Sequence, residues 1–253
     1  MIKIHKEVYG HGPVIVMIHG WAMHTGIWRK FAQELSKNHQ VVCLDLPGHG
    51  LSESVEPYDL DMITQVLVKK IPDRSFAVLG WSLGATVALN MAKQFPERVD
   101  SLILMAGNAH FINTEDWPGM SLVLLDDFAA MLQLNCQATL LRFLGLQVNG
   151  LVNGKALLKD IKQQINACEP PSENVLKSGL DILKTADLRE SLMALTCSVN
   201  IIQGDKDTLI PSQAGVCMQE LQPKCELNTI LGAGHVPFLS HPSTVLEILN
   251  RFL

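Results

Sequence analysis

Short runs of bulky apolar residues alternate with helix-like stretches along most of the chain. The runs extend over 14–18, 41–44, 76–79, 102–105, 199–202 and 226–231, and the helix-like stretches over 27–37, 60–71, 83–95, 212–221 and 242–253. The first four runs lack polar residues at every second position, which is typical of parallel strands that are covered on both faces. Strands that alternate with helices predict an α/β fold with a mostly parallel central sheet flanked by helices.

This alternation is interrupted between residues 110 and 190. Apolar residues there follow helical spacing, as Leu125, Phe128 and Leu132 do, and the segment has almost no strand pattern. We therefore predict one α/β core made of residues 1–109 and 191–253, with an all-helical insertion over 110–190. Because open α/β sheets bind ligands at the carboxyl ends of their strands, we interpret the insertion as a lid over that edge.

The composition excludes several classes of protein. Apolar residues make up 47% of the 253 residues, which excludes a disordered chain, and the net charge of −5 disfavours nucleic acid as a partner. No apolar run approaches the ~20 residues of a membrane span, and the first residues lack the apolar core of a signal peptide. The six cysteines have neither C-x-x-C nor zinc-finger spacing. We expect a cytoplasmic, monomeric protein with reduced thiols.

The segment Gly80–Gly84 (Gly-Trp-Ser-Leu-Gly) matches the G-x-S-x-G pattern of a nucleophile elbow. It follows a predicted strand and opens a predicted helix, which is the context that this motif requires. Glycines are needed because the sharp turn brings two backbones together. The alternative is a tight turn with a capping serine. The context favours Ser82 as a nucleophile whose hydroxyl projects from the sheet.

A serine hydroxyl needs a base to take its proton, and the base needs an acid to orient it. Among nine histidines, His235 lies in a glycine-rich loop after the last predicted strand, whereas His241 precedes a proline and resembles a helix start. The acid is expected in the loop at 204–211, where the pattern G-x-x-D-x-x-I-P selects Asp207 over Asp205. The order Ser82, Asp207, His235 is that of α/β-hydrolases.

An oxyanion hole needs two backbone N–H groups that point at the developing negative charge. We expect one from Leu83, directly after the nucleophile, and one from Trp21, in the loop after the first buried run. His19 and His49 are interpreted as residues that brace loops. Trp81 can either line the pocket or pack under the elbow, and we favour the pocket. No P-loop, G-x-G-x-x-G or H-E-x-x-H motif is present, so neither a cofactor nor a metal is implied.

Four motifs together resemble those of α/β-hydrolases, at 19–21, 45–50, 80–84 and 234–235. More narrowly, the chain is similar over nearly its whole length to the pimeloyl-[acyl-carrier protein] methyl ester esterases of biotin synthesis. The segments that carry this narrower resemblance are 80–84, 96–99, 116–119, 142–147, 179–185 and 237–242. The resemblance implies an α/β-hydrolase fold and hydrolysis of a methyl ester, with release of methanol and a free carboxylate.

The resemblance also implies functional residues. Contacts with the substrate are implied for Trp21, Ser82, Leu83, Phe143, Leu144, Gly145, Leu146, Gln147 and His235. Docking of an acyl-carrier protein is implied for Arg142, Lys155 and Lys159. Ala138 stands where a further arginine is expected, and two of the three matches are lysines, which lack the bidentate fork of arginine. Looser docking of the carrier is therefore expected.

The charges of residues 136–165 agree with a carrier-docking surface. Arg142, Lys155, Lys159 and Lys162 stand against the single acid Asp160. The three lysines fall on one helical face, and an acidic carrier protein would be attracted to it. The alternative is an ordinary solvated helix face.

The sequence leaves other functions open. A general short-chain carboxylesterase, a lactonase or a C–C bond hydrolase would carry the same three catalytic residues. A non-catalytic, hydrolase-like binding protein is disfavoured because the catalytic set is complete.

Overall fold

The computed structural model describes residues 2–253, which form a seven-stranded sheet with helices on both faces. The strand order is β1-β3-β2-β4-β5-β6-β7, and every neighbouring pair is parallel except β1 with β3. The strands are β1 (Lys6–Tyr9), β2 (Val14–Ile18), β3 (Gln40–Leu44), β4 (Phe76–Trp81), β5 (Val99–Met105), β6 (Ser198–Gly204) and β7 (Glu226–Ile230). The predicted mostly parallel α/β fold is confirmed.

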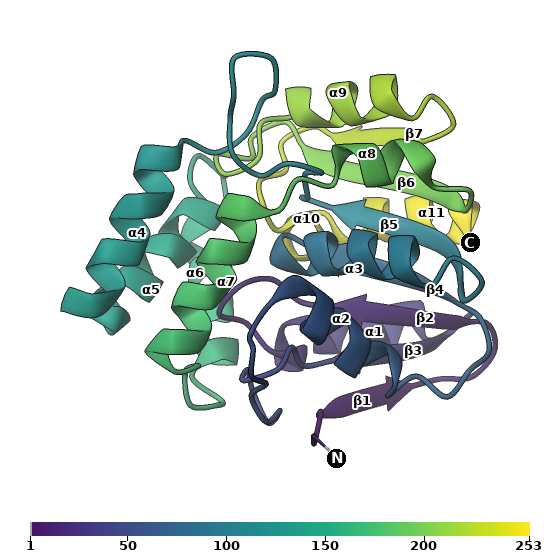
Figure 1. Cartoon of the computed structure of the whole chain (residues 1–253), viewed down its shortest axis with the longest axis horizontal. Helices are drawn as coiled ribbons and strands as arrows, with labels where there is room; N and C mark the ends of the chain where they lie inside the picture. The colour runs from purple at the N-terminus through teal and green to yellow at the C-terminus, as the bar shows by residue number, and fades with distance from the viewer. Residues whose placement is uncertain (1) are drawn as a thin grey trace.

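Two helical layers cover the two faces of this sheet (Figure 1). One layer holds α2 (Leu60–Val68), α3 (Leu83–Gln94), α8 (Arg189–Ala194) and α9 (Gln213–Leu221). The other holds α1 (Arg29–Leu35), α10 (Pro237–Ser240) and α11 (Pro242–Phe252). Successive β2 residues alternate between the two apolar cores, with Val16 in one and Met17 in the other. Both faces are buried, which explains why the central strands show no polar alternation.

Between β5 and β6 the chain leaves the sheet and forms a group of helices at the carboxyl ends of the parallel strands (Figure 1). This group consists of α4 (Leu122–Leu134), α5 (Cys136–Gln147), α6 (Gly154–Ile165) and α7 (Glu173–Thr185). The insertion is not all-helical as expected, because residues 110–120 form a loop with isolated bridges such as Ile112 to Met120. The following α8 packs on α3 and α9.

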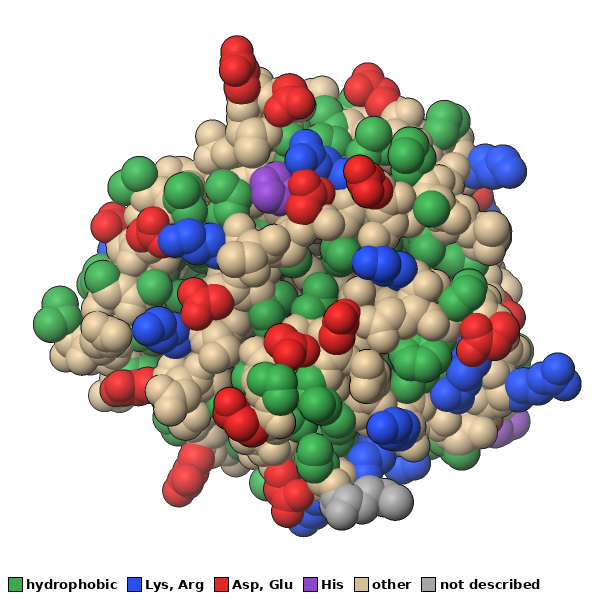
Figure 2. Space-filling model, viewed as in Figure 1, with side chains coloured by type: hydrophobic (Ala, Val, Ile, Leu, Met, Phe, Trp, Pro, Cys, Tyr) green, Lys and Arg blue, Asp and Glu red, His purple; other side chains and the backbone are tan. Residues whose placement is uncertain are grey.

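In the view of Figure 2, acidic and basic side chains are interspersed over the surface. None of the helices within residues 2–253 has both the length and the hydropathy that a membrane crossing requires.

Candidate active site

The turn from β4 into α3 holds Ser82 in a conformation that a non-glycine residue rarely adopts, with φ 56° and ψ −120°. The flanking glycines make this turn possible. A β-carbon on Gly80 would lie 2.1 Å from the Gly84 carbonyl oxygen, and one on Gly84 would lie 2.2 Å from the Ile18 carbonyl oxygen. The backbone strain at Ser82 is therefore built into the packing of β4, α3 and β2, as expected of a functional turn.

Three side chains from separate loops meet at this turn. The Nε2 atom of His235 lies 2.9 Å from the Oγ atom of Ser82, and its Nδ1 atom lies 2.8 Å from the Oδ2 atom of Asp207. The Oδ1 atom of Asp207 accepts hydrogen bonds from the backbone N–H groups of Leu209 and Ile210, which fix the carboxylate. The arrangement supplies a nucleophile, a base and an acid that selects the tautomer of the base.

The two alternative residues, Asp205 and His241, form other hydrogen bonds, and within residues 2–253 neither bonds to Ser82 or His235. Asp205 lies one residue after β6, and its Oδ1 atom accepts a hydrogen bond from the Gly232 N–H at 2.6 Å. It therefore anchors the start of the loop that carries His235. The Nδ1 atom of His241 lies 2.9 Å from the Ser240 hydroxyl, at the start of α11.

The two expected oxyanion donors lie beside Ser82. Leu83 is the first residue of α3, so its N–H has no partner within the helix. The loop after β2 passes close to the nucleophile, since a β-carbon on Gly20 would lie 3.2 Å from the β-carbon of Ser82. Over the described residues, neither the Leu83 nor the Trp21 amide donates a hydrogen bond to the protein. Both are therefore available to a ligand.

His19 fixes the orientation of the loop that carries Trp21. Its Nδ1 atom lies 2.8 Å from the Gly20 carbonyl oxygen, and its Nε2 atom accepts a hydrogen bond from the Leu46 N–H at 3.0 Å. Nδ1 must therefore carry the proton and donate it to Gly20. Because a trans peptide points its C=O and N–H in opposite directions, this bond turns the Trp21 N–H away from His19. Burial lowers the pKa of His19 to about 3, so the ring stays neutral.

Asp45 was missed as a residue that supports the site. Its carboxylate is 1% exposed and accepts hydrogen bonds from the backbone N–H groups of Thr25 and Leu51. It thereby ties the loop after β2 to the loop after β3. The only sequence signal for this role was its place in the 45–50 motif.

Trp81 does not line a pocket, and that expectation was wrong. Its side chain is fully buried, and its Nε1–H donates a hydrogen bond to the His235 carbonyl at 2.7 Å. Its ring contacts those of Phe238 and Trp28 in the core beneath the catalytic histidine. Trp81 therefore supports the backbone of the His235 loop from below.

The expected substrate-binding stretch forms the second half of α5. It consists of Phe143, Leu144, Gly145, Leu146 and Gln147. The Phe143 ring packs edge-on against the indole of Trp21 at 4.8 Å, and the Leu146 carbonyl accepts a hydrogen bond from the Thr208 hydroxyl, next to Asp207. Gln147 is 1% exposed, and neither polar atom of its amide has a partner in the described chain. A buried amide of this kind is costly unless a ligand pairs with it.

The expected carrier-docking residues lie outside this apolar interior. Arg142 is exposed on α5, with its guanidinium 5.2 Å from the centre of the Phe128 ring, and Lys155 and Lys159 are exposed on α6. Over residues 2–253, none of these three forms an ion pair with an acidic side chain. The Arg142 guanidinium also donates to the Met131 sulfur at 3.0 Å, so the three residues are exposed cations without an acidic partner in the described chain.

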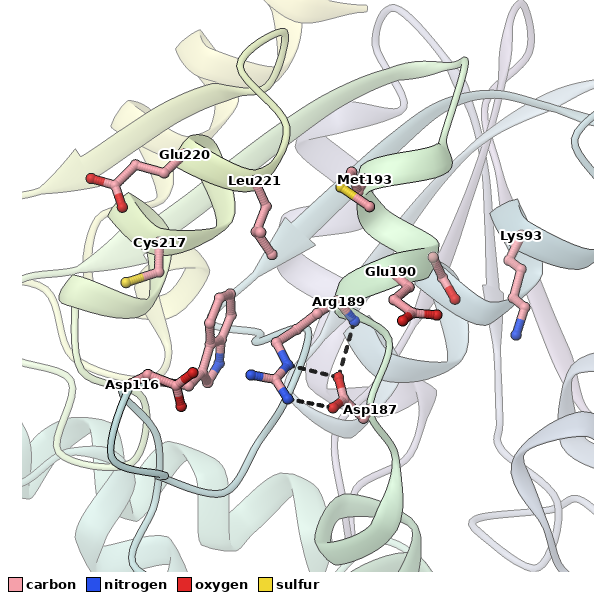
Figure 3. Close-up of a pocket in the computed structure, with 11 residues that line it drawn as sticks. Lys93, Asp116, Asp187, Arg189, Glu190, Met193, Cys217, Glu220 and Leu221 are labelled. Carbon is pink, nitrogen blue, oxygen red and sulfur yellow. Dashed lines mark hydrogen bonds and ion pairs between the residues drawn. The ribbon is translucent and has the colours of Figure 1, made fainter.

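A surface pocket of about 730 Å³ lies away from these residues, between the 111–120 loop, α8 and α9 (Figure 3). Arg189 lies in it, but two hydrogen bonds hold its guanidinium to Asp187, and the same group stacks on Trp117 at 5.3 Å. The Arg189 cation is therefore already paired with groups of the protein. The described residues contain no group of three or more side chains arranged to hold a metal ion.

Comparison with known proteins identifies the family of this chain. The family model of the alpha/beta hydrolase fold matches residues 13–242. The chain is 40% identical over 251 residues to the pimeloyl-[acyl-carrier protein] methyl ester esterase of Nitrosomonas europaea, covering 99% of each protein. It is 36% identical over 247 residues to the enzyme of that name from Methylococcus capsulatus, covering 98% of this chain and 97% of the other.

Among solved structures, an esterase from Exiguobacterium antarcticum superposes with a TM-score of 0.89 at 22% identity, covering 99% of this chain and 95% of the other. That likeness concerns the fold. On the family model and the full-length relatives, the chain belongs to the α/β-hydrolase family and, within it, to the family of the pimeloyl-[acyl-carrier protein] methyl ester esterases.

Proposed function

We propose that this protein is a serine carboxylesterase that hydrolyses the methyl ester of pimeloyl-[acyl-carrier protein] in biotin synthesis. The observation that carries the chemistry is the hydrogen-bonded series Ser82, His235 and Asp207, with distances of 2.9 and 2.8 Å. The substrate is inferred from the full-length relatives that bear this name. We further propose that the protein is cytoplasmic and monomeric and uses no cofactor.

In the first half of the reaction, the Ser82 oxygen attacks the ester carbonyl carbon while His235 Nε2 takes the hydroxyl proton. The carbonyl oxygen becomes an oxyanion that accepts hydrogen bonds from the Trp21 and Leu83 amides. The C–O bond to the methoxy group then breaks, and His235 returns its proton to the leaving oxygen as methanol departs. The acyl group remains on Ser82.

In the second half, water attacks the acyl-enzyme carbonyl and gives a proton to His235. The oxyanion forms again at the same two amides. When it collapses, the bond to Ser82 breaks, the serine recovers its proton from His235, and a free carboxylic acid leaves. Asp207 holds the imidazole and stabilises its charged form in both halves.

The insertion supplies the substrate contacts in this proposal. Ser82 is 3% exposed, and we propose that the acyl chain reaches it between the helices of the insertion, which then act as a lid. The Phe143–Gln147 stretch lines the entry, and the unpaired amide of Gln147 is free to bond a polar group of the bound chain. Arg142, Lys155 and Lys159 dock the acidic carrier.

The test is rescue of a bacterial biotin auxotroph that lacks its own pimeloyl-carrier methyl ester esterase. The wild-type gene should restore growth without biotin, and Ser82→Ala should not, although the variant should fold, because the covalent route has no substitute. Purified protein is assayed in parallel on p-nitrophenyl butyrate. Hydrolysis of that ester without rescue indicates a general carboxylesterase. No activity in either assay indicates a binding protein.

A further inference from the structure

Helix α7 touches both residues of the proposed oxyanion hole at a single glycine. A β-carbon on Gly179 would lie 2.8 Å from Cδ1 and 3.1 Å from Nε1 of the Trp21 indole, and 3.5 Å from Cδ2 of Leu83. The first of these distances is shorter than real β-carbon contacts. Glycine is unfavourable inside a helix compared with alanine. Its presence at the middle of α7 is therefore explained by close packing against Trp21.

A hydrogen bond joins the same two elements. The Trp21 Nε1–H donates to the carbonyl of Leu176, nearly one turn before Gly179, at 2.8 Å. Trp21 is 1% exposed and Leu176 is fully buried, so no solvent competes for this bond. On another side, the Phe143 ring of α5 packs edge-on against the indole. The Trp21 side chain is thus clamped by the insertion, while its backbone belongs to the loop after β2.

This clamp acts on the catalytic geometry because the proposed donor is the backbone N–H of Trp21 itself. His19 fixes the peptide on one side through the Gly20 carbonyl, and the indole fixes the residue on the other. We propose that α7 positions the oxyanion hole, with Gly179 and the Leu176 carbonyl as its positioning groups. The hole is then complete only when α7 lies against Trp21. This inference rests on the proposed serine esterase chemistry.

The first test is Gly179→Ala, assayed on p-nitrophenyl butyrate so that carrier docking has no part in the result. The added methyl group displaces the indole, and kcat should fall at least ~10-fold, as expected when an oxyanion donor is misplaced. KM should stay within ~2-fold, because the donors act mainly in the transition state. The matched control is Ser178→Ala on the same helix. It also raises helix propensity but leaves Gly179 in place, and it should keep wild-type kcat.

A double-mutant cycle separates this role from a general effect on folding. Trp21→Leu keeps the backbone amide and removes the indole that the new methyl group would strike. In that background Gly179→Ala should change kcat less than ~2-fold, which makes the two substitutions strongly non-additive. Equal losses of kcat in both backgrounds would overturn the proposal. So would a folded Gly179→Ala enzyme with wild-type kcat.

A third variant tests the hydrogen bond without adding bulk. Trp21→Phe keeps an aromatic ring against Phe143 but cannot donate to the Leu176 carbonyl, so kcat should fall ~3- to 10-fold with little change in KM. A wild-type kcat for this variant would contradict the clamp even if Gly179→Ala failed to fold. Ser82→Ala in the same assay distinguishes failure of the serine mechanism from failure of the positioning role proposed for α7. Activity that survives this substitution refutes the serine mechanism itself, whereas a negative result at Gly179 leaves it standing.

Discussion

Two aspartates in one turn illustrate how position decides the role of a carboxylate. Asp207 is buried and divides its oxygens between His235 and two backbone N–H groups. Asp205, two residues earlier, is half-buried; its Oδ1 atom accepts from the Gly232 N–H, and its Oδ2 atom lies 3.5 Å from the Lys206 ammonium. Both carboxylates hold the loop that carries His235, Asp205 through the Gly232 N–H and Asp207 through the imidazole itself.

We expect Asp207→Asn to lower kcat on p-nitrophenyl butyrate by about three to four orders of magnitude. The amide can donate to His235 Nδ1, which selects the wrong tautomer of the base. Asp205→Asn keeps an oxygen that can accept from Gly232 and should retain most of the activity, whereas Asp205→Ala removes that oxygen and should lower both activity and thermal stability. A larger kcat loss for Asp205→Asn than for Asp207→Asn would reverse the assignment.

For single residues, the roles that depend on the local sequence pattern could be predicted, and those that depend on contacts between residues distant in the chain could not. The turn at Ser82 and the G-x-x-D-x-x-I-P loop identify their residues from neighbours in the chain. Trp81 was placed wrongly because its direction is set by Trp28 and Phe238, far away in sequence. The importance of Gly179 appears only when Trp21 is seen against it.

The helices α5 and α6 carry the most specific part of the proposed function, which is recognition of the carrier. Arg142, Lys155 and Lys159 are exposed and have no acidic partner within residues 2–253. An exposed, unpaired cation can meet an acidic partner without first breaking an internal ion pair. The effect on encounter should be electrostatic and sensitive to salt.

The triple variant Arg142→Glu, Lys155→Glu, Lys159→Glu should raise KM for the carrier-bound methyl ester at least ~10-fold, equivalent to about 1.4 kcal/mol. Hydrolysis of p-nitrophenyl butyrate should change little, since the triad is untouched. Added salt should reproduce the effect in the wild-type enzyme, because exposed charges are screened beyond ~10 Å at 0.1 M.

The matched control reverses three exposed lysines elsewhere, with Lys69→Glu, Lys93→Glu and Lys224→Glu. It changes the net charge equally and should leave KM for the carrier substrate within ~2-fold of wild type, because none of these lysines lies on α5 or α6. A KM that responds equally to both triple variants would show that net charge matters and that α5 and α6 do not dock the carrier.

Elements with a strong internal pattern could be predicted, whereas the edge strand β1 and the loop at 110–120 could not. The central strands and α3 follow from their apolar runs and bounding glycines. The edge strand β1 was missed because Lys6–Tyr9 alternates between exposed and half-buried positions, and its pairing with β3 is antiparallel. The loop at 110–120 is held by contacts such as the bond from Trp117 Nε1 to Asn108, which no periodicity reveals.

On the scale of the whole molecule, two buried histidines beside the candidate active site make the stability of the fold depend on pH. His19 and His49 are fully buried with ring centres 5.4 Å apart, between the loops after β2 and β3. Burial is the main cause that lowers the pKa of each to about 3. The groups around them are Asp45, His24 and Tyr58. The same packing that orients the loop carrying Trp21 therefore disfavours protonation of His19 and His49.

The lowered pKa values of His19 and His49 predict how the free energy of unfolding depends on pH. Between pH ~6.5 and ~3 each of the two histidines binds a proton in the unfolded chain but not in the folded one, so acid favours unfolding. Their stabilising contribution is fully present above pH ~6.5 and is lost as the pH falls, by up to about 1.4 kcal/mol per pH unit for each histidine. Urea unfolding at several pH values from 7.5 to 5 measures this slope.

The variant His49→Asn removes one of the two protons that the chain takes up on unfolding and leaves the one that His19 binds. The asparagine amide can still donate to the Pro47 carbonyl, as His49 Nδ1 does at 3.0 Å, and it removes the unpartnered Nε2 atom. The variant should therefore fold, and its slope below pH ~6.5 should be smaller than that of the wild type by about one proton. Above pH 7 the difference in stability between the two should be constant. Parallel slopes down to pH 5 would mean that His49 gains no proton on unfolding, which contradicts the burial argument for this pair.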